Sequence, residues 1–142
     1  MLCPDVNVLL YAFRRDSVDH AEYARWLQNA MTGQEPIGIS ELVLSGVVRL
    51  ATNHRVFRQP STTSASFDFC QAVRSAPAAI PLRPSGKHWE IFSGLCRAVS
   101  ATANDVPDAY HAALALEHGA IWITNNRGFA KFPNLKWRPP FE

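Results

Sequence analysis

Residues 104–126 read NDVPDAYHAALALEHGAIWITNN, and this stretch joins a helical pattern directly to a strand pattern. Pro107 suits the first turn of a helix, where its missing N–H costs no hydrogen bond. The helix that follows is rich in alanine, which allows close packing on a sheet. After Gly119, the apolar run Ala120–Thr124 is the clearest strand in the chain. A helix that leads straight into a buried strand indicates an α/β protein.

The same alternation continues through the rest of the chain. Short apolar runs predict strands at Leu2–Pro4, Ile37–Ile39 and Ile80–Leu82. Helical patterns cover Val8–Phe13, Ala21–Met31 with a stop at Gly33, Leu42–Ala51, a segment that Ser61 can cap and that runs through Val73, and Trp89–Val99. Strands alternating with helices predict a mostly parallel central sheet between two helical layers. We expect one domain over residues 1–142.

Composition narrows the class of protein but does not identify a function. Of the 142 residues 47% are hydrophobic and 18% charged, which excludes a disordered chain. No apolar run reaches the roughly 20 residues of a membrane span, and the start, Met1–Asp5, lacks the basic region of a secretory signal. We therefore expect a cytoplasmic protein without a membrane partner. The three cysteines are dispersed, which favours reduced thiols over disulfides or a zinc site.

Oxygen-bearing side chains follow the predicted strands. Asp5 follows the first strand, Glu41 follows the second after Ser40, and Asn126 comes just after the last. Asp105 and Asp108 lie three residues apart at the start of the alanine-rich helix. Each has a purely structural alternative, because aspartates cap helices and asparagines form turns. Asp105 suits the cap ahead of Pro107, which leaves Asp108 free on the inner turn.

Taken together, these side chains favour a metal site. In parallel sheets, ligands bind at the carboxyl ends of the strands. Oxygen ligands without a histidine or cysteine cluster suit a hard cation such as Mg²⁺ or Mn²⁺. Carboxylates that converge on one point repel each other and need such a cation. The cation would activate water and stabilise charge on a phosphodiester.

Four segments in order resemble the VapC-type PIN domains. They are DVNVLLYAF (5–13), ELVLSGVVRLATNHRVF (41–57), NDVPDAYHAALALEHGA (104–120) and WITNNRGFAKF (122–132). The resemblance implies a PIN-like three-layer α/β/α sandwich and a Mg²⁺-dependent endoribonuclease, in which Mn²⁺ substitutes for Mg²⁺. It also implies the toxin of a toxin–antitoxin pair, which cleaves structured RNA such as tRNA or rRNA. A cognate VapB-like antitoxin and a homodimer are the partners that it implies.

The resemblance assigns roles to individual residues. Asp5 and Asp108 match metal-binding acids, and both are expected to be catalytic. Glu41 is expected to be catalytic as well, although many members carry this acid one residue later, where Leu42 stands here. Asn126 occupies a position that is acidic in many members, and is expected to be a weak ligand or an outer partner. The remaining expectations are Asp105 as a cap or outer partner of Asp108 and Arg127 as a phosphate contact.

Two other functions stay open at this point. A phosphatase of the haloacid dehalogenase type also begins with an aspartate after the first strand, but it needs a second aspartate where this chain has Asn7. A non-catalytic PIN-like RNA-binding module is the other, because Asn126 removes one acid from the set. His111 lies one turn after Asp108, and we expect it to pack against the sheet rather than act as a base.

Overall fold

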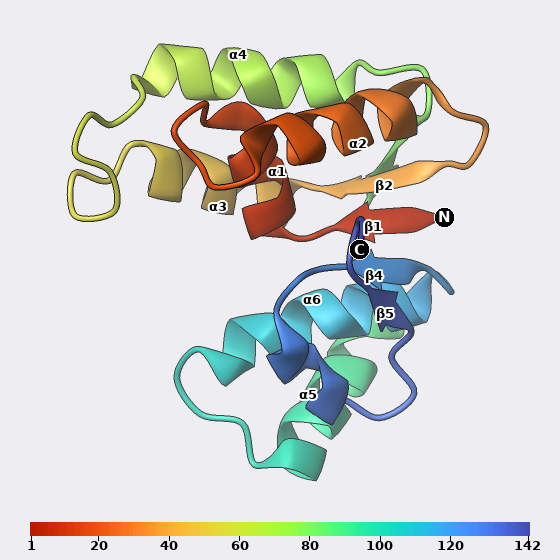
Figure 1. Cartoon of the computed structure of the whole chain (residues 1–142). Coiled ribbons are helices and arrows are strands. Elements are labelled where there is room, and N and C mark those ends of the chain that lie inside the picture. The colour runs from red at the N-terminus through yellow and green to blue at the C-terminus, as the bar shows by residue number, and fades with distance from the viewer.

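A computed structural model describes all residues from 1 to 142 and confirms the three-layer α/β/α sandwich. Five parallel strands form one sheet in the order β3-β2-β1-β4-β5. Figure 1 shows α1 to α4 on one side of the strands and α5 and α6 on the other. None of the helices has the length and apolarity that crossing a membrane requires. The elements in chain order are β1 (Leu2–Pro4), α1 (Val6–Phe13), α2 (His20–Thr32), β2 (Ile37–Ser40), α3 (Glu41–Ala51), α4 (Thr63–Arg74), β3 (Ala79–Leu82), α5 (His88–Val99), α6 (Asp105–Glu117), β4 (Ile121–Ile123), the 3₁₀ helix η1 (Arg127–Lys131) and β5 (Trp137–Arg138).

The central strand β1 positions the candidate site. All three of its residues are buried, and it pairs with β2 on one side and β4 on the other. Because the sheet is parallel, β1, β2 and β4 all end at the same edge. Pro4 lies opposite Ile123 in this register, and the backbone N–H of Asp5 donates to the carbonyl of Ile123 at 2.9 Å. The residues that follow β1 and β4 are therefore neighbours, although the sequence separates them widely.

Helix starts differ from the sequence expectations at two places. Thr62 rather than Ser61 caps α4, because its hydroxyl accepts from the backbone N–H of Ala65 at 3.1 Å. Ser61 instead accepts from the Arg14 guanidinium at 2.9 Å. The expectation that Asp105 caps α6 was also wrong: Asn104 stands at the cap position without a side-chain bond, and Asp105 is the first helical residue.

A second departure from expectation is the short edge strand β5, which no sequence pattern indicated. Its two residues, Trp137 and Arg138, pair with Trp122 and Ile123 of β4. The other strands were predicted to within one residue, and Ile80–Leu82 forms most of the opposite edge strand β3. Both sheet edges are therefore short, which limits unwanted pairing with other chains.

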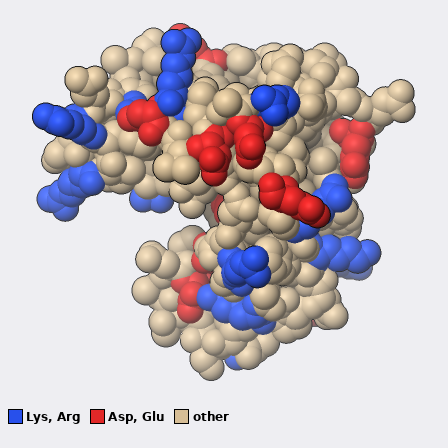
Figure 2. Space-filling model, in the orientation of Figure 1, with Lys and Arg blue, Asp and Glu red and all other residues tan.

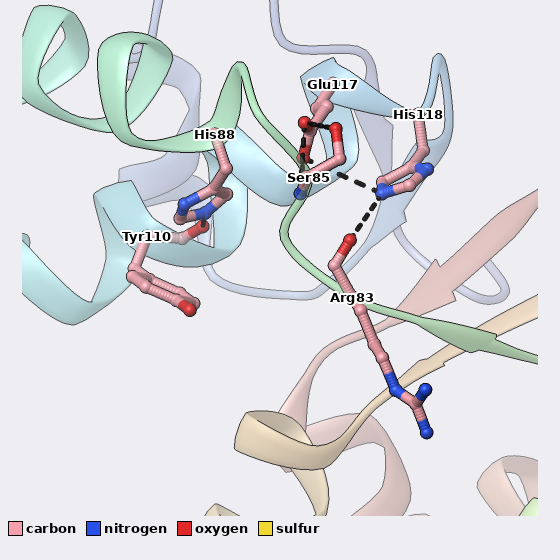
Figure 3. A network of polar contacts seen from close by, with 6 residues as sticks. All are labelled: Arg83, Ser85, His88, Tyr110, Glu117 and His118. Atoms are coloured by element: carbon pink, nitrogen blue, oxygen red, sulfur yellow. Dashed lines mark hydrogen bonds and ion pairs between the residues drawn. The ribbon is translucent and has the colours of Figure 1, made fainter.

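A polar network ties the connection after β3 to the far end of α6 (Figure 3). The backbone N–H of Ser85 donates to both carboxylate oxygens of Glu117, at 3.1 and 3.2 Å, and the Ser85 hydroxyl donates to Glu117 as well. The imidazole of His118 lies 2.8 Å from the Arg83 carbonyl. Within the α5–α6 pair, the His88 imidazole lies 3.1 Å from the Tyr110 carbonyl. These bonds fix α6, whose first turn carries Asp108, against the rest of the protein.

Gly46 allows α3 to approach α1 directly behind the candidate site. A Cβ atom on Gly46 would lie 3.0 Å from Cγ2 and 3.3 Å from Cγ1 of Val6, the first residue of α1. Gly94 in α5 has open space at the same position. The two helical glycines therefore differ in packing alone, which makes them a matched pair.

We expect Gly46→Leu to lower the free energy of unfolding by about 1–3 kcal/mol, because the larger side chain overpacks the α1–α3 contact. Gly94→Leu is expected to raise it by about 0.5–1 kcal/mol, because glycine is a poor helix former and nothing obstructs the new side chain. Urea denaturation of the two variants checks both signs. Equal effects of the two substitutions would contradict the close approach at Gly46.

Candidate metal centre

Asp5 is a buried carboxylate at the end of the central strand. Only 7% of the residue is exposed. Its Oδ2 accepts a hydrogen bond from the Thr124 hydroxyl at 2.6 Å, and its Oδ1 accepts from the backbone N–H of Val6 at 2.7 Å. Burial raises the pKa of Asp5 to about 6, although the bonds from Thr124 and Val6 lower it, and the charge of Asp108 adds to the rise. The carboxylate thus caps α1, and its charged form is poorly solvated.

Asp108 lies on the first turn of α6, half-buried and close enough to act on Asp5. The pKa of Asp108 is raised, mainly by burial. The charge of Lys131 opposes this rise, and the charge of Asp105 adds to it. Asp105 itself forms an ion pair with the ammonium of Lys131, the last residue of η1. The charge of Asp108 thus acts on Asp5, and the Asp105–Lys131 ion pair lies in and beside the same first turn of α6.

Thr124 is a residue of the candidate site that sequence reasoning missed. The residue is 1% exposed, and its hydroxyl both donates to Asp5 and accepts from the backbone N–H of Asn126 at 3.0 Å. This relay fixes the orientation of the Asp5 carboxylate. The signal in the sequence was a hydroxyl residue at the end of an otherwise apolar strand, which resembles an ordinary strand residue.

Asn126 acts on the site through its backbone. Its side-chain Oδ1 accepts from the backbone N–H of Gly128 at 2.9 Å and caps η1. The neighbouring Asn125 donates to the hydroxyl of Tyr23. Both asparagines line a cavity of about 160 Å³ together with Asn7. Asn126 is therefore one hydrogen bond removed from the Asp5–Thr124 pair.

Glu41 lies apart from the two aspartates. It is the first residue of α3, its side chain is 68% exposed, and it pairs with Arg74 of α4 at 3.6 Å. It lines a groove of about 380 Å³ between α3 and α4, with an apolar floor that includes Leu44 and Val48. No group of three acidic, histidine or cysteine side chains is arranged to hold a metal. Glu41 thus does not complete a three-acid cluster with Asp5 and Asp108.

Two further candidates have clear surroundings. His111 is buried and stacks on Trp122 with ring centroids 5.3 Å apart, and burial lowers its pKa to about 4. This confirms it as a helix-packing residue. Arg127 is exposed at the start of η1 and forms no ion pair, so its role as a phosphate contact stays a prediction.

The arrangement suits a hard cation completed by other ligands. Figure 2 shows a hollow between the two halves of the molecule, with acidic atoms visible inside it. All the available donors are oxygens, and one of the two carboxylates is buried at a cost that a cation would offset. Mg²⁺ is commonly held by one or two carboxylates together with water and substrate phosphates. Two aspartates are therefore sufficient protein ligands for such an ion.

Comparison with known proteins gives consistent results. Residues 2–135 match the family described as PIN domain. The chain is 44% identical over 142 residues to ribonuclease VapC43 of Mycobacterium tuberculosis, covering 100% of this chain and 97% of that protein. It is 34% identical to ribonuclease VapC25 of the same species, covering 99% of each.

Solved structures share the fold. One is VapBC2 from Rickettsia felis, bound to a DNA fragment from its promoter, with a TM-score of 0.68, 20% identity and 97% of each chain covered. Another is VapBC-1 from nontypeable Haemophilus influenzae, with a TM-score of 0.70, 13% identity and coverage of 99% of this chain and 98% of that one. At these identities the likeness concerns the fold alone.

The raised pKa of Asp5 predicts how stability depends on pH without metal. Between its unfolded value of 3.8 and about 6, the folded state holds a proton that the unfolded state has lost, so stability falls as pH rises through this window. The full effect is on the order of 3 kcal/mol. His111 opposes it, because its lowered pKa makes stability rise with pH over much of the same range. The two contributions must therefore be separated by mutation.

We expect Asp5→Asn to be more stable than the wild type above pH 6 in EDTA, with the difference vanishing near pH 4. Denaturant titrations across this range measure it, and Asp68→Asn, at an exposed acid of α4, is the control expected to follow the wild type. A constant difference between Asp5→Asn and wild type at all pH values would show that burial does not shift the Asp5 carboxyl.

Proposed function

The chain belongs to the PIN-domain family, and on that premise we propose that it is a divalent-metal-dependent endoribonuclease held in check by a protein antitoxin. The observation that carries the proposal is the pair formed by buried Asp5 and half-buried Asp108 at the carboxyl edge of the sheet. Relatives at 44% and 34% identity over nearly their whole length are named ribonucleases, which supports RNA as the substrate.

Asp5 and Asp108 are the proposed ligands of Mg²⁺, with Mn²⁺ as a substitute. The ion, when bound, supplies an activated water and stabilises charge on the phosphodiester. Thr124 orients Asp5 by donating to Oδ2, which restricts rotation of the carboxylate group. Asn126 holds Thr124 through its backbone N–H. The chain would thus supply two negative charges and hydrogen bonds that fix the orientation of Asp5. Coordination positions would remain for water and RNA.

Glu41 needs a test of its own, because it lies outside the proposed metal site. Its pairing with Arg74 holds it on the groove between α3 and α4, so we propose no metal contact for it. A catalytic part would then require the side chain to leave Arg74 when RNA binds. Comparing Glu41→Gln with Arg74→Gln in a cleavage assay tests this, because loss of activity in the first variant alone would place Glu41 at the substrate.

We expect Asp5→Asn and Asp108→Asn each to reduce RNA cleavage by at least about a hundredfold while the fold is retained, since each removes a charge that holds the cation. Gel assays of a labelled RNA with Mg²⁺ or Mn²⁺ measure this, and circular dichroism checks the fold. Asp68→Asn serves as the control with an unchanged rate, because Asp68 is an exposed acid of α4.

The competing function is a non-catalytic RNA-binding module, which the absence of a three-acid cluster favours. Such a module binds RNA equally well with EDTA and with Mg²⁺, and leaves it intact. Uncut RNA at high enzyme concentration with either metal would contradict the nuclease and favour the module. A phosphatase is tested in parallel with a small phosphomonoester, which we expect to remain unhydrolysed.

The proposed partner is an antitoxin of the VapB kind. Solved structures of this fold include VapBC proteins from several bacteria, which supports a VapB-like partner for this chain. A homodimer of this chain is part of the same proposal. Light scattering of the purified protein, alone and with the antitoxin, measures both assemblies.

Expression of the chain alone is expected to arrest growth, and co-expression of the antitoxin from the adjacent small gene is expected to restore it. The physical reason is that cleavage of RNA needed for translation stops protein synthesis. Growth curves compare the wild type with Asp108→Asn at matched protein levels. Equal arrest by both proteins would mean that toxicity does not come from the metal site.

A further inference from the structure

Lys131 projects from an anchored segment beside the candidate metal centre. It is the last residue of η1, which Asn126 caps through Gly128. Phe129 and Phe132, on either side of it in sequence, are 1% and 3% exposed and anchor this segment in the core. The ammonium lies 5.4 Å from the centre of the Phe132 ring. The backbone from which Lys131 projects is therefore anchored, although the residue itself is at the surface.

The ammonium of Lys131 faces the first turn of α6. It forms an ion pair with Asp105, which lies three residues before Asp108 in that same turn. The side chain of Lys131 is 35% exposed, and that of Asp105 is 39% exposed. Since an ammonium has three donors and Asp105 takes one of them, donors remain for a ligand that arrives from solvent.

A purely structural role explains this arrangement poorly. An ion pair this exposed contributes little to stability. A cation next to Asp108 also opposes the binding of a metal ion there, because like charges repel. A lysine at this position therefore weakens the metal site unless something negative binds between the two cations. A phosphodiester, the substrate under the proposed function, has that charge.

We propose that Lys131 binds an RNA phosphate next to the metal position and that Asp105 holds it there. This inference rests on the proposed nuclease function. Asp105 keeps the ammonium from folding onto Asp108, so that the metal position stays open between Asp5 and Asp108. Lys131 then supplies positive charge at the phosphate, while Asn126 adds no negative charge to the site.

Lys131→Met is the central test, because it removes the charge and keeps an unbranched side chain. Binding of a fluorescently labelled RNA stem-loop is measured in EDTA, where no cleavage occurs, over a range of salt concentrations. We expect affinity to fall by about threefold to tenfold at low salt, as for loss of one charged contact. The slope of log affinity against log salt is expected to flatten by about 0.7, the value for one phosphate on a single strand.

Mn²⁺ binding without RNA gives a second readout of opposite sign. Calorimetry is expected to show tighter Mn²⁺ binding by Lys131→Met, by roughly twofold to tenfold, because a neighbouring positive charge is gone. A structural role for Lys131 predicts weaker binding of both Mn²⁺ and RNA, since the site would loosen. Lys131→Arg should restore RNA affinity and the salt slope.

Lys136→Met is the matched control. Lys136 is an exposed lysine on the same C-terminal segment, but it precedes β5 and so lies at the opposite edge of the parallel sheet. We expect its RNA affinity and salt slope to equal those of the wild type. An equal loss in both variants would mean that Lys131 contributes only general positive charge, and this overturns the inference.

The two levels of the proposal fail in different ways. If the wild type cleaves RNA but Lys131→Met binds the stem-loop with unchanged affinity and salt slope, the role of Lys131 is wrong and the nuclease proposal stands. If the wild type neither binds the stem-loop in EDTA nor cleaves RNA with Mn²⁺, the proposed function is wrong and the inference about Lys131 falls with it.

Discussion

The burial of one carboxylate constrains everything around it. Asp5 follows the central strand and caps the first helix, and its burial leaves little of its charge open to solvent. Two hydrogen bonds stabilise the carboxylate: one from the backbone N–H of Val6 in α1 and one from the hydroxyl of Thr124, just after β4. These bonds only partly offset the loss of solvation, since the pKa of Asp5 remains raised. The neighbouring strands and helix are thus arranged around a charge whose burial favours a proton or a cation.

Much of this arrangement was predictable from the sequence because it depends on chain pattern. Buried strands, the parallel sheet and the place of Asp5 at the carboxyl ends of the strands follow from the alternation of elements and from the common edge where parallel strands end. Thr124 was not predictable, because a hydroxyl at a strand end has the same sequence context whether or not it donates to a carboxylate. The Asp105–Lys131 pair joins residues 26 positions apart, and no local pattern reports such a contact. Whether Glu41 faces the site depends on its exact position in the helix, because a shift of one residue rotates a side chain by about 100° around the helix axis.

The charge balance at the site differs from that of a closed metal cage. Two aspartates supply negative charge, Asn126 supplies none, and the Lys131 ammonium pairs with Asp105 in the same helical turn as Asp108. The oxygen of Asn126 is already committed to capping η1. Such a site binds a cation less strongly than a cluster of four acids would, which makes the substrate's own phosphate part of the coordination. Metal and RNA are then expected to bind cooperatively, each completing the surroundings of the other.

The strand order β3-β2-β1-β4-β5 also has a consequence in time. A ribosome makes β1 first and β4 nearly last, yet the two strands are neighbours in the sheet, and the bond from Thr124 to Asp5 joins residues 119 positions apart. A chain that is only partly synthesised therefore contains Asp5 without Thr124 or Asp108, and its first strand has a vacant side. Translation has to proceed almost to the end before the two carboxylates can meet.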